Sequence, residues 1–432
     1  MRERIVDAPV GSGTTGGAER TPVPARYARG MFLGITNTPR DYAWGSTSAI
    51  PELLGRTVTG APQAELWLGA HAGSPSVVVN PAMVGGADTL RDWIDAEPEA
   101  ALGPDRSGLP FLLKLLAAAA PLSLQAHPTP EQAREGFARE EAAGIPLDDP
   151  ARNYKDPFPK PELVVALSDR FEALSGFRPV GDSVAEVESL DGGSGRLGPL
   201  LAHLAQGLED TVRWLETADA SALAVVQAAS DLATALPEDD RTPNVQTVVD
   251  LAAAYPGDPG VVVSMLMHRV TLRTGEAMYL PAGNVHAYLD GLGIELMAPS
   301  DNVLRGGLTA KHVDVPELLR VLDFTAYPAP VLTPERLDQG VDRFAPDGVG
   351  FALVRVTGDG RPVGLGTGGV APLSGPSIAV CTTGAVTLVG ARSATLLRQG
   401  ESCYVTPDEG DVTVEADAAT GLTSTVFIAT GA

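Results

Sequence analysis

The chain has 432 residues, of which 44% are hydrophobic and 5% aromatic, and it contains 48 Gly and 36 Pro. That length is enough for two or three domains with cores of their own, and the Gly and Pro content favours short strands and many turns. The formal net charge of −23 argues against nucleic acid and against anionic membrane surfaces as partners. No uninterrupted apolar run approaches 18 residues, so we expect no membrane span.

The N-terminal segment differs from the rest in composition. Residues 1–30 are rich in Gly, Thr and Pro and lack the apolar region of a signal peptide. We therefore predict a flexible tail over 1–30, a fold that begins at Met31 and a cytoplasmic location. Cys381 and Cys403, the two cysteines, are expected to be buried free thiols.

Short apolar runs broken by Gly and Pro dominate residues 31–180. "ELWLGAHAGSPSVVVN" and "KPELVVALSD" predict strands. "TPEQAREGFAREEAAG" predicts a helix, because Thr129 and Pro130 suit its cap and first turn. "PFLLKLLAAAAPLSL" is compatible with either a helix or a strand.

Residues 184–256 have a helical pattern. "SALAVVQAASDLATAL" and "NVQTVVDLAAAY" continue it, so we predict a helical insertion in a β-rich chain. One β-domain would then comprise 31–183 and 257–326, and a second would comprise 327–432. One amphipathic helix is predicted from apolar residues at steps of three and four, namely Leu201, Leu204, Leu208, Val212 and Leu215.

An internal repeat supports two related β-domains. "LRTGEAMYLPAGNVHAYL" from Leu272 resembles "LRQGESCYVTPDEGDVTVEA" from Leu397, which predicts a mainly β fold of two jelly rolls plus the helical insertion. Eleven residues after the repeated Gly, the first copy has His286 and the second has Asp411. No histidine follows His312, so we expect the C-terminal domain to lack a histidine metal site.

Four side chains could form a metal site. In "PLSLQAHPTP", a strand would place Gln125 and His127 on one face, although a solvated polar strand end is the alternative. Glu162 opens an apolar strand, where an unpaired carboxylate would be costly to bury. His286 follows a Pro-Ala-Gly-Asn turn at the entry of a strand. Two imidazoles, a carboxylate and an amide oxygen suit zinc with an open position.

Six segments together resemble the type I mannose-6-phosphate isomerase family. They are "YAWGS", "ELWLGAH", "LPFLLKLL", "PLSLQAHP", "KPELVVAL" and "LPAGNVHAYLDGLGIELMAPSDNVLRGGLTAKHVDVPELL", in the family's order from Met31 to about Phe324. The resemblance implies a zinc-dependent cupin enzyme that interconverts mannose 6-phosphate and fructose 6-phosphate through a cis-enediol. It implies one zinc per chain, held by Gln125, His127, Glu162 and His286. It also implies that a substrate cleft is lined by Lys114, Ser123, Lys160, Glu295, Asp301, Arg305 and Lys311.

The isomerisation needs a base, an electrophile and a phosphate anchor. We expect Arg305 to stabilise the enediolate, with a surface ion pair to Asp301 as the alternative. Asp301 and Glu295 compete for the role of base, and Lys160 belongs to the same catalytic group. Trp44 and Trp67 are expected to pack beneath the site. The predicted phosphate anchor comprises Lys114, Ser123 and Lys311, with a snorkelling Lys114 as the alternative.

The chain departs from the family pattern at one place. Family members commonly have Asn-His before Lys-Pro-Glu, whereas Phe158 and Pro159 stand here. A proton-transfer role for that histidine therefore cannot apply to this chain. Two other functions stay open: a sugar-phosphate-binding cupin without catalysis, and a cupin oxygenase, which would prefer three histidines. The expected partner is a small phosphorylated sugar, and we predict a monomer.

Overall fold

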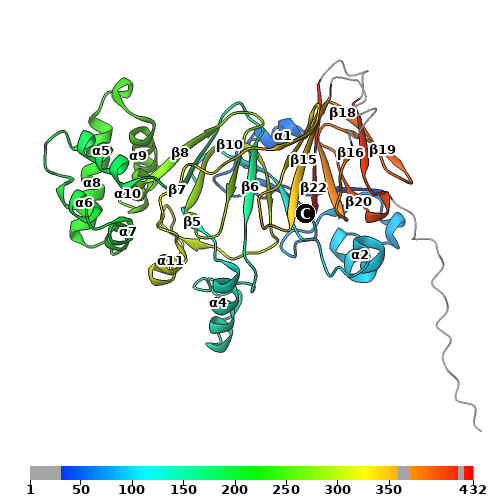
Figure 1. The fold of residues 1–432 in the computed structure, drawn as a ribbon, viewed down its shortest axis with the longest axis horizontal. Helices are drawn as coiled ribbons and strands as arrows, with labels where there is room; N and C mark the ends of the chain where they lie inside the picture. Colours follow the sequence, from blue (N-terminus) through cyan, green and yellow to red (C-terminus); the bar gives the residue numbers. More distant parts are fainter. Residues whose placement is uncertain (1–30, 359–369, 417–422, 432) are drawn as a thin grey trace, which may run out of the picture.

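The protein is elongated, with a helical bundle at one end, a β-barrel in the middle and a second β-lobe at the other end (Figure 1). This computed structural model describes residues 31–358, 370–416 and 423–431, so the expected tail over 1–30 lies outside the described residues. The predicted fold class, two jelly-roll domains with a helical insertion, is confirmed. None of the helices in the described ranges is long and apolar enough to cross a membrane.

The central barrel is built around one long strand, β10 (His286–Met297). The C-terminal half of β10 pairs with β4 and β6, and its N-terminal half pairs with β5 and β7, so two sheets share this strand. The strand order is β2-β4-β10-β6-β9-β12 in one sheet and β11-β5-β10-β7-β8 in the other. The remaining strands are β2 (Glu65–Leu68), β4 (Leu112–Ala118), β5 (Gln125–Ala126), β6 (Glu162–Ala166), β7 (Phe171–Phe177), β8 (Met267–Leu272), β9 (Ala277–Leu280), β11 (Leu304–Arg305) and β12 (Val331–Leu332).

A β-bulge interrupts β10. The register with β7 shifts between Tyr288 and Asp290. Residues nine apart, such as His286 and Glu295, point to opposite faces in a regular strand, but one extra residue reverses the alternation. Both side chains consequently lie on the inner side of the barrel, where Tyr288 Oη donates a hydrogen bond to Glu295 at 2.8 Å.

The second β-lobe also includes strands from the start of the chain. β1 pairs with both β20 and β3, a pairing that the sequence did not predict. An eight-stranded sheet has the order β13-β14-β15-β22-β17-β20-β1-β3, and a four-stranded sheet has the order β16-β21-β18-β19. These strands are β1 (Phe32–Thr36), β3 (Val77–Val78), β13 (Glu335–Asp338), β14 (Val341–Phe344), β15 (Phe351–Gly358), β16 (Val370–Ala371), β17 (Ser377–Thr383), β18 (Ala385–Val389), β19 (Ala394–Arg398), β20 (Ser402–Val405), β21 (Val412–Ala416) and β22 (Ser424–Gly431).

The repeated Leu-Arg-x-Gly-Glu segments form the same turn in both lobes. Glu276 accepts a hydrogen bond from Arg273 N at 2.9 Å, and Glu401 accepts one from Arg398 N at 2.8 Å. The intervening glycines have positive φ values of 85° and 83°, a conformation that glycine adopts without strain. The sequence repeat therefore corresponds to equivalent turns in the two lobes, each of which joins strands of two different sheets. Both cysteines are buried and free, as expected.

The helical segments largely follow the predicted pattern. Thr129 and Gln132 form a capping box at the start of α4. The single helix predicted through Leu201 and Leu215 is wrong, because the chain breaks at Gly207 into α6 and α7. The helices are α1 (Ala49–Leu53), α2 (Leu90–Ala96), α3 (Pro98–Leu102), α4 (Pro130–Ala142), α5 (Val180–Asp191), α6 (Gly198–Leu204), α7 (Leu208–Glu216), α8 (Ala220–Ala235), α9 (Pro243–Ala254), α10 (Gly260–Val263) and α11 (Val315–Val321).

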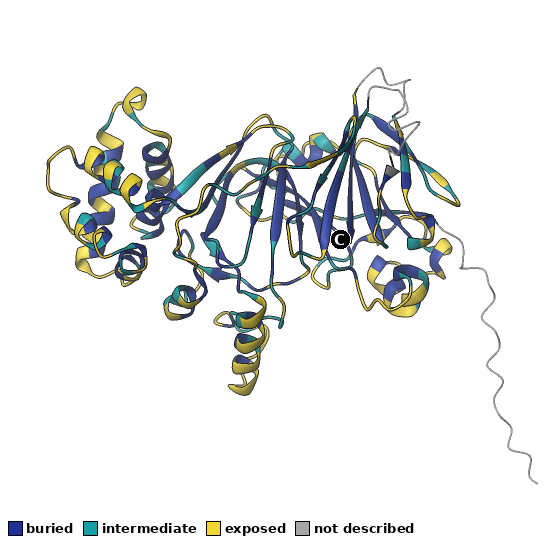
Figure 2. Cartoon of the chain, in the orientation of Figure 1, coloured by how far each residue is buried: buried dark blue, intermediate teal, exposed yellow. Residues whose placement is uncertain are grey.

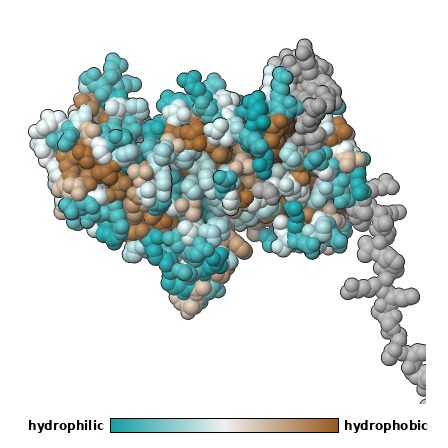
Figure 3. All heavy atoms as spheres, in the orientation of Figure 1, coloured by the Kyte–Doolittle hydropathy of each residue, from teal (hydrophilic) through white to brown (hydrophobic). Residues whose placement is uncertain are grey.

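Buried side chains fill most strands of both lobes and one face of the longer bundle helices (Figure 2). All seven residues of β4 are buried, because one face lines the barrel and the other packs against the second lobe. The burial of both faces explains why the sequence around Lys114 does not alternate between apolar and polar residues. Helix α4 projects away from the barrel, and its face in Figure 3 is mostly hydrophilic.

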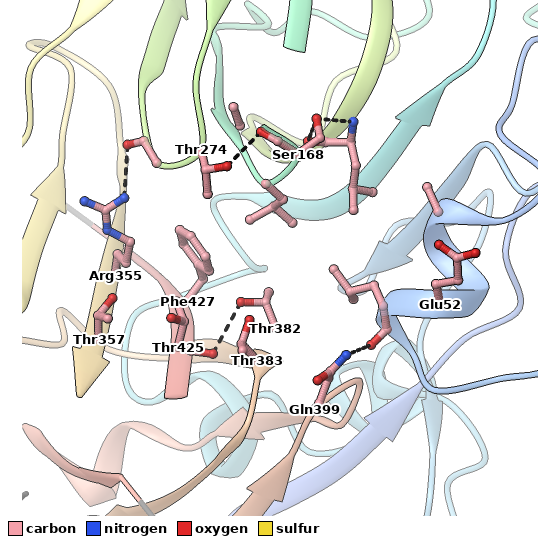
Figure 4. Close-up of a pocket in the computed structure, with 16 residues that line it drawn as sticks. Glu52, Ser168, Thr274, Arg355, Thr357, Thr382, Thr383, Gln399, Thr425 and Phe427 are labelled. Atoms are coloured by element: carbon pink, nitrogen blue, oxygen red, sulfur yellow. Dashed lines mark hydrogen bonds between the residues drawn. The ribbon is translucent and has the colours of Figure 1, made fainter. Parts of the chain in front are cut away.

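A cavity of about 620 Å³ lies between the two β-lobes. Arg355 reaches across it and donates a hydrogen bond to the carbonyl of Gly275 at 3.0 Å (Figure 4). None of the predicted site residues lines this cavity. It is therefore separate from the candidate site inside the barrel.

Candidate metal centre and active site

Three of the four predicted metal ligands converge inside the barrel. His127 directly follows β5, Glu162 opens β6 and His286 opens β10, and all three are buried. Their ligand atoms lie within 4.8 Å of one another. His127 Nε2 is 3.4 Å from Glu162 Oε1, and His286 Nε2 is 3.5 Å from Glu162 Oε2.

Backbone carbonyls fix the orientation of both imidazoles. His127 Nδ1 is 2.8 Å from the carbonyl of Asn302, and His286 Nδ1 is 3.0 Å from that of Asn284. A carbonyl can only accept, so each Nδ1 carries the proton and each Nε2 turns a lone pair toward Glu162. His127 Nε2 is buried and has no hydrogen-bond partner in the described ranges. Lone pairs that face a carboxylate call for a cation between them, and this donor set fits zinc.

Charges inside the barrel reinforce this arrangement. Burial lowers the pKa of His127 to about 4, which keeps its imidazole neutral. Burial alone would raise the pKa of Glu162, but the nearby Lys160 cation lowers it well below its usual range. Lys160 Nζ lies 3.1 Å from Glu162 Oε1. The centre therefore combines an ionised Glu162 carboxylate with a neutral His127 imidazole, the states that a metal requires.

Gln125 lies beside these three ligands. Its backbone is directly opposite His286 on β10 and opposite Arg305 on β11, so it sits between them on one face. Its amide Nε2 donates to Ser123 Oγ at 3.4 Å, which leaves the oxygen uncommitted among the described residues. Its role as the fourth ligand stays a prediction.

Lys114 is held by two carboxylates on the inner face of the barrel. Its Nζ lies 3.0 Å from Glu295 Oε2 and 3.6 Å from Glu65 Oε1, and 5.1 Å from the centre of the Trp67 ring. Burial disfavours the charge on Lys114, but Glu295 and Glu65 outweigh it and raise its pKa. The snorkelling alternative is wrong, because the ammonium group is buried rather than solvated.

Glu295 has a second partner, Tyr288. Burial raises the pKa of Glu295, although the Lys114 cation opposes this shift. Burial, followed by the charge of Glu295, also raises the pKa of Tyr288 well above its usual value. Because Glu295 is buried and engaged by both neighbours, it is poorly placed to approach a substrate.

Asp301 is more accessible, with 54% of its side chain exposed. Its Oδ2 lies 3.3 Å from His71 Nε2, and this hydrogen bond lowers the pKa of Asp301. The alternative pairing of Asp301 with Arg305 is absent, and no carboxylate of the described chain lies within ion-pair distance of Arg305. Burial, followed by the charge of Arg305, lowers the pKa of Lys311, so these two cations are neighbours.

The sequence interpretation did not single out several residues around the centre. Glu65 and His71 both lie in "ELWLGAH", a segment used only for the strand prediction and the family resemblance. Tyr288 is two residues after His286, and this spacing in a strand was the available signal. Nothing in the sequence pointed to the contact of Asn302 with His127. Two further histidines have separate partners: His203 with Asp210, and His268 with the carbonyl of Tyr327.

Comparisons with known proteins agree with this geometry. Residues 32–180 match the family described as phosphomannose isomerase type I, catalytic domain. The chain is 38% identical over 399 residues to mannose-6-phosphate isomerase of Escherichia coli strain K12, covering 88% of this chain and 96% of the relative.

Solved structures extend this similarity to the fold. The apo form of mannose 6-phosphate isomerase from Salmonella typhimurium superposes with a TM-score of 0.78 at 33% identity, over 93% of this chain and 99% of that one. A zinc-bound mannose 6-phosphate isomerase structure gives the same TM-score, identity and coverage. The chain therefore belongs to the type I phosphomannose isomerase family.

Proposed function

We propose that the protein is a zinc-dependent aldose–ketose isomerase that interconverts mannose 6-phosphate and fructose 6-phosphate. The observation that carries this proposal is the convergence of two Nε2 lone pairs and a carboxylate on one buried point. The names of the relatives supply the substrate, and the zinc-bound structure of a relative supports the metal. His127, Glu162 and His286 would hold the zinc, with Gln125 as the fourth ligand.

When bound, zinc supplies a Lewis acid that polarises and orients substrate oxygens. The remaining chemistry belongs to the side chains around it. Isomerisation removes the C2 proton of the open-chain aldose, forms a cis-enediol and returns a proton to C1. Asp301 is the carboxylate best placed to carry that proton, because it is accessible and its lowered pKa keeps it ionised.

Glu295 would then orient Lys114 rather than act as the base. Its contacts with Lys114 and Tyr288 fix the ammonium group within the barrel wall. Lys114 and Ser123 would contribute hydrogen bonds to the substrate. Lys160 Nζ lies 3.1 Å from Glu162 Oε1, so the ammonium group would contact both this metal ligand and the reacting oxygens of the substrate.

Arg305 would supply positive charge at the cleft. It has no ion-pair partner in the described chain, and it lies opposite Gln125 in the β5–β11 pairing. A guanidinium in this position can stabilise the enediolate that forms during proton transfer. Lys311, close to Arg305, would hold the phosphate, and phosphate binding would fix the reacting carbons in place.

The test is a coupled assay with mannose 6-phosphate on protein stripped of metal and then reconstituted with zinc. Fructose 6-phosphate should form only after zinc is restored. A protein that binds the sugar phosphate without turnover would instead be a sensor, and oxygen uptake would indicate an oxygenase. Arg305→Ala should lose turnover while retaining zinc, measured by metal analysis of the same sample.

The sequence interpretation includes three further properties that belong to this proposal. We propose that the protein works as a monomer, that it is cytoplasmic, and that its two β-domains divide near residue 327, with β1 and β3 as the exception because they pair in the second lobe. Light scattering after size-exclusion chromatography tests the first of these. A dimeric mass at micromolar concentration would contradict it.

A further inference from the structure

Asn302 lies fully buried between two loops at the edge of the metal centre. We propose that Asn302 is a positioning residue that holds His127 in its metal-binding orientation by joining residues 155–158 to residues 300–302. This inference rests on the zinc site of the proposed function, but it does not depend on the substrate.

Both ends of the Asn302 amide are engaged with one segment. Its Oδ1 accepts hydrogen bonds from Lys155 N at 2.7 Å and Asp156 N at 3.2 Å. Its Nδ2 donates to the carbonyls of Asp156 at 2.7 Å and Phe158 at 2.9 Å. Only a side chain that both donates and accepts can make these contacts, so an aspartate of the same shape would lose the two donated bonds.

The carboxylate of Asp156 also joins the two loops. It accepts hydrogen bonds from Ser300 Oγ at 2.8 Å, Asp301 N at 2.9 Å and Phe158 N at 3.0 Å. Ser300 is also buried, and its hydroxyl lies 3.3 Å from Asn302 N. The two loops are therefore locked together by both side chain and backbone, and the loop that carries Asp301 is part of the same unit.

The connection reaches the metal through the backbone of Asn302. Its carbonyl accepts the Nδ1 hydrogen of His127 at 2.8 Å and so directs Nε2 toward Glu162. Partners of this kind around a metal ligand usually set both its tautomer and its basicity. Residues 155–158 also lead directly into Lys160 and Glu162, so one asparagine connects the two walls of the centre.

Phe158 and Pro159 stand where family members commonly have Asn-His, and this difference makes the positioning role of Asn302 more important in this chain. Pro159 has no backbone N–H, and the neighbouring Phe158 side chain is 61% exposed. The segment before Lys160 is therefore anchored through the backbone of residues 155–158 and the carboxylate of Asp156. Asn302 provides four of those contacts.

The test compares the zinc affinity of full-length variants by competition with a chelating dye. Asn302→Ala and Asn302→Asp should each bind zinc about 10- to 100-fold more weakly than the wild type. Ser300→Ala, a milder change, should weaken binding less in the same direction. Asn37→Ala is the matched control, because the Asn37 amide also donates to two backbone carbonyls, those of Trp67 and Ser74, but neither belongs to a metal ligand. Its zinc affinity should equal that of the wild type.

A second measurement separates this inference from the proposed function. Nitrogen-15 NMR of the His127 ring in zinc-free protein should show the Nδ1–H tautomer in the wild type and a mixture of tautomers in Asn302→Ala. Equal zinc affinities together with an unchanged tautomer would overturn the positioning role. If the wild type fails to bind zinc but the tautomer still changes, the proposed function fails and the positioning role of Asn302 stands.

Discussion

His71 and Asp301 form a pair whose hydrogen bond has a defined direction. His71 Nδ1 accepts a hydrogen bond from Gly73 N at 3.1 Å, so its proton lies on Nε2, 3.3 Å from Asp301 Oδ2. This bond lowers the pKa of Asp301. The hydrogen bond from His71 therefore keeps the accessible Asp301 carboxylate ionised beside the metal centre.

Removing His71 should change the pH dependence of the reaction. An ionised base works above its pKa, and activity falls as the pH drops through that pKa. In His71→Ala the pKa of Asp301 rises toward its usual value, so the acidic limb of kcat/KM should move to higher pH. His268→Ala, far from Asp301, is the control. Identical acidic limbs in all three proteins would contradict the role of His71.

Gly307 allows the loop that follows Arg305 to pack closely against Asp258 and Gly260, at the end of the helical insertion. Its φ is 107°, and a Cβ there would lie 2.8 Å from Asp258 Oδ1 and 3.1 Å from Gly260 Cα. Gly307→Ala should lower the free energy of unfolding by about 1–3 kcal/mol and raise KM for the sugar phosphate by about tenfold. Urea unfolding and steady-state kinetics measure the two effects.

The neighbouring glycine provides the control for this variant. A Cβ at Gly306 would meet the flexible end of Leu318 at 3.3 Å and would make an ordinary contact with Leu124 Cβ at 3.7 Å. Gly306→Ala should therefore change stability and KM much less. If Gly307→Ala lost stability without any change in KM, the loop would not depend on this contact for substrate binding.

The buried ion pair of Lys114 should be strongly coupled to stability. Lys114→Met leaves Glu295 and Glu65 without their shared cation, which should cost about 3–5 kcal/mol of unfolding free energy. Lys114→Met combined with Glu295→Gln should recover at least about 1 kcal/mol, because one of the stranded charges is removed. Strict additivity of the two changes in urea unfolding would argue against the pairing.

The burial of Glu216 predicts that the free energy of unfolding falls as the pH rises. Its Oε1 is buried without a hydrogen-bond partner in the described chain, and burial, followed by the charge of Asp258, raises its pKa to about 8. Between the ordinary value near 4.5 and 8, the folded state holds a proton that the unfolded state has lost, so stability falls as the pH rises. Glu216→Gln should remove this loss.

Glu216→Gln should raise the free energy of unfolding by about 2 kcal/mol at pH 8 and by close to zero at pH 4.5. One pKa unit corresponds to about 1.4 kcal/mol, and the partial exposure of Glu216 reduces the effect. Urea unfolding across this range measures it. Glu209→Gln, an exposed residue on the same helix that pairs with Arg213, is the control and should show no such trend. A gain that is constant with pH would mean that Glu216 is not the titrating group.

The sequence predicted the metal centre better than the surrounding charge network. His127, Glu162 and His286 each carried a local signal: a strand position, a costly buried carboxylate or a turn before a strand. Lys114 carried a less specific one, because a strand buried on both faces has no alternation that reveals where a lysine points. Its carboxylate partners come from strands far apart in the sequence, and only their register brings them together.

The division of the chain between lobes shows a similar limit. β1 pairs with β20 across more than 360 residues, and no local pattern encodes such a partner. The break at Gly207 was visible as a glycine, but the leucine spacing continues through it. Tertiary packing of α6 and α7 decided that position, and helical periodicity alone could not.

The bulge between Tyr288 and Asp290 has a consequence for tolerated changes in chain length. A strand with two inward-facing groups at an odd separation keeps them in phase only while one surplus residue is present. Deleting a single residue such as Leu289 would turn either the His286 half or the Glu295 half of the strand toward the wrong side. Functional relatives should therefore conserve the number of residues between these two positions more strictly than their identities.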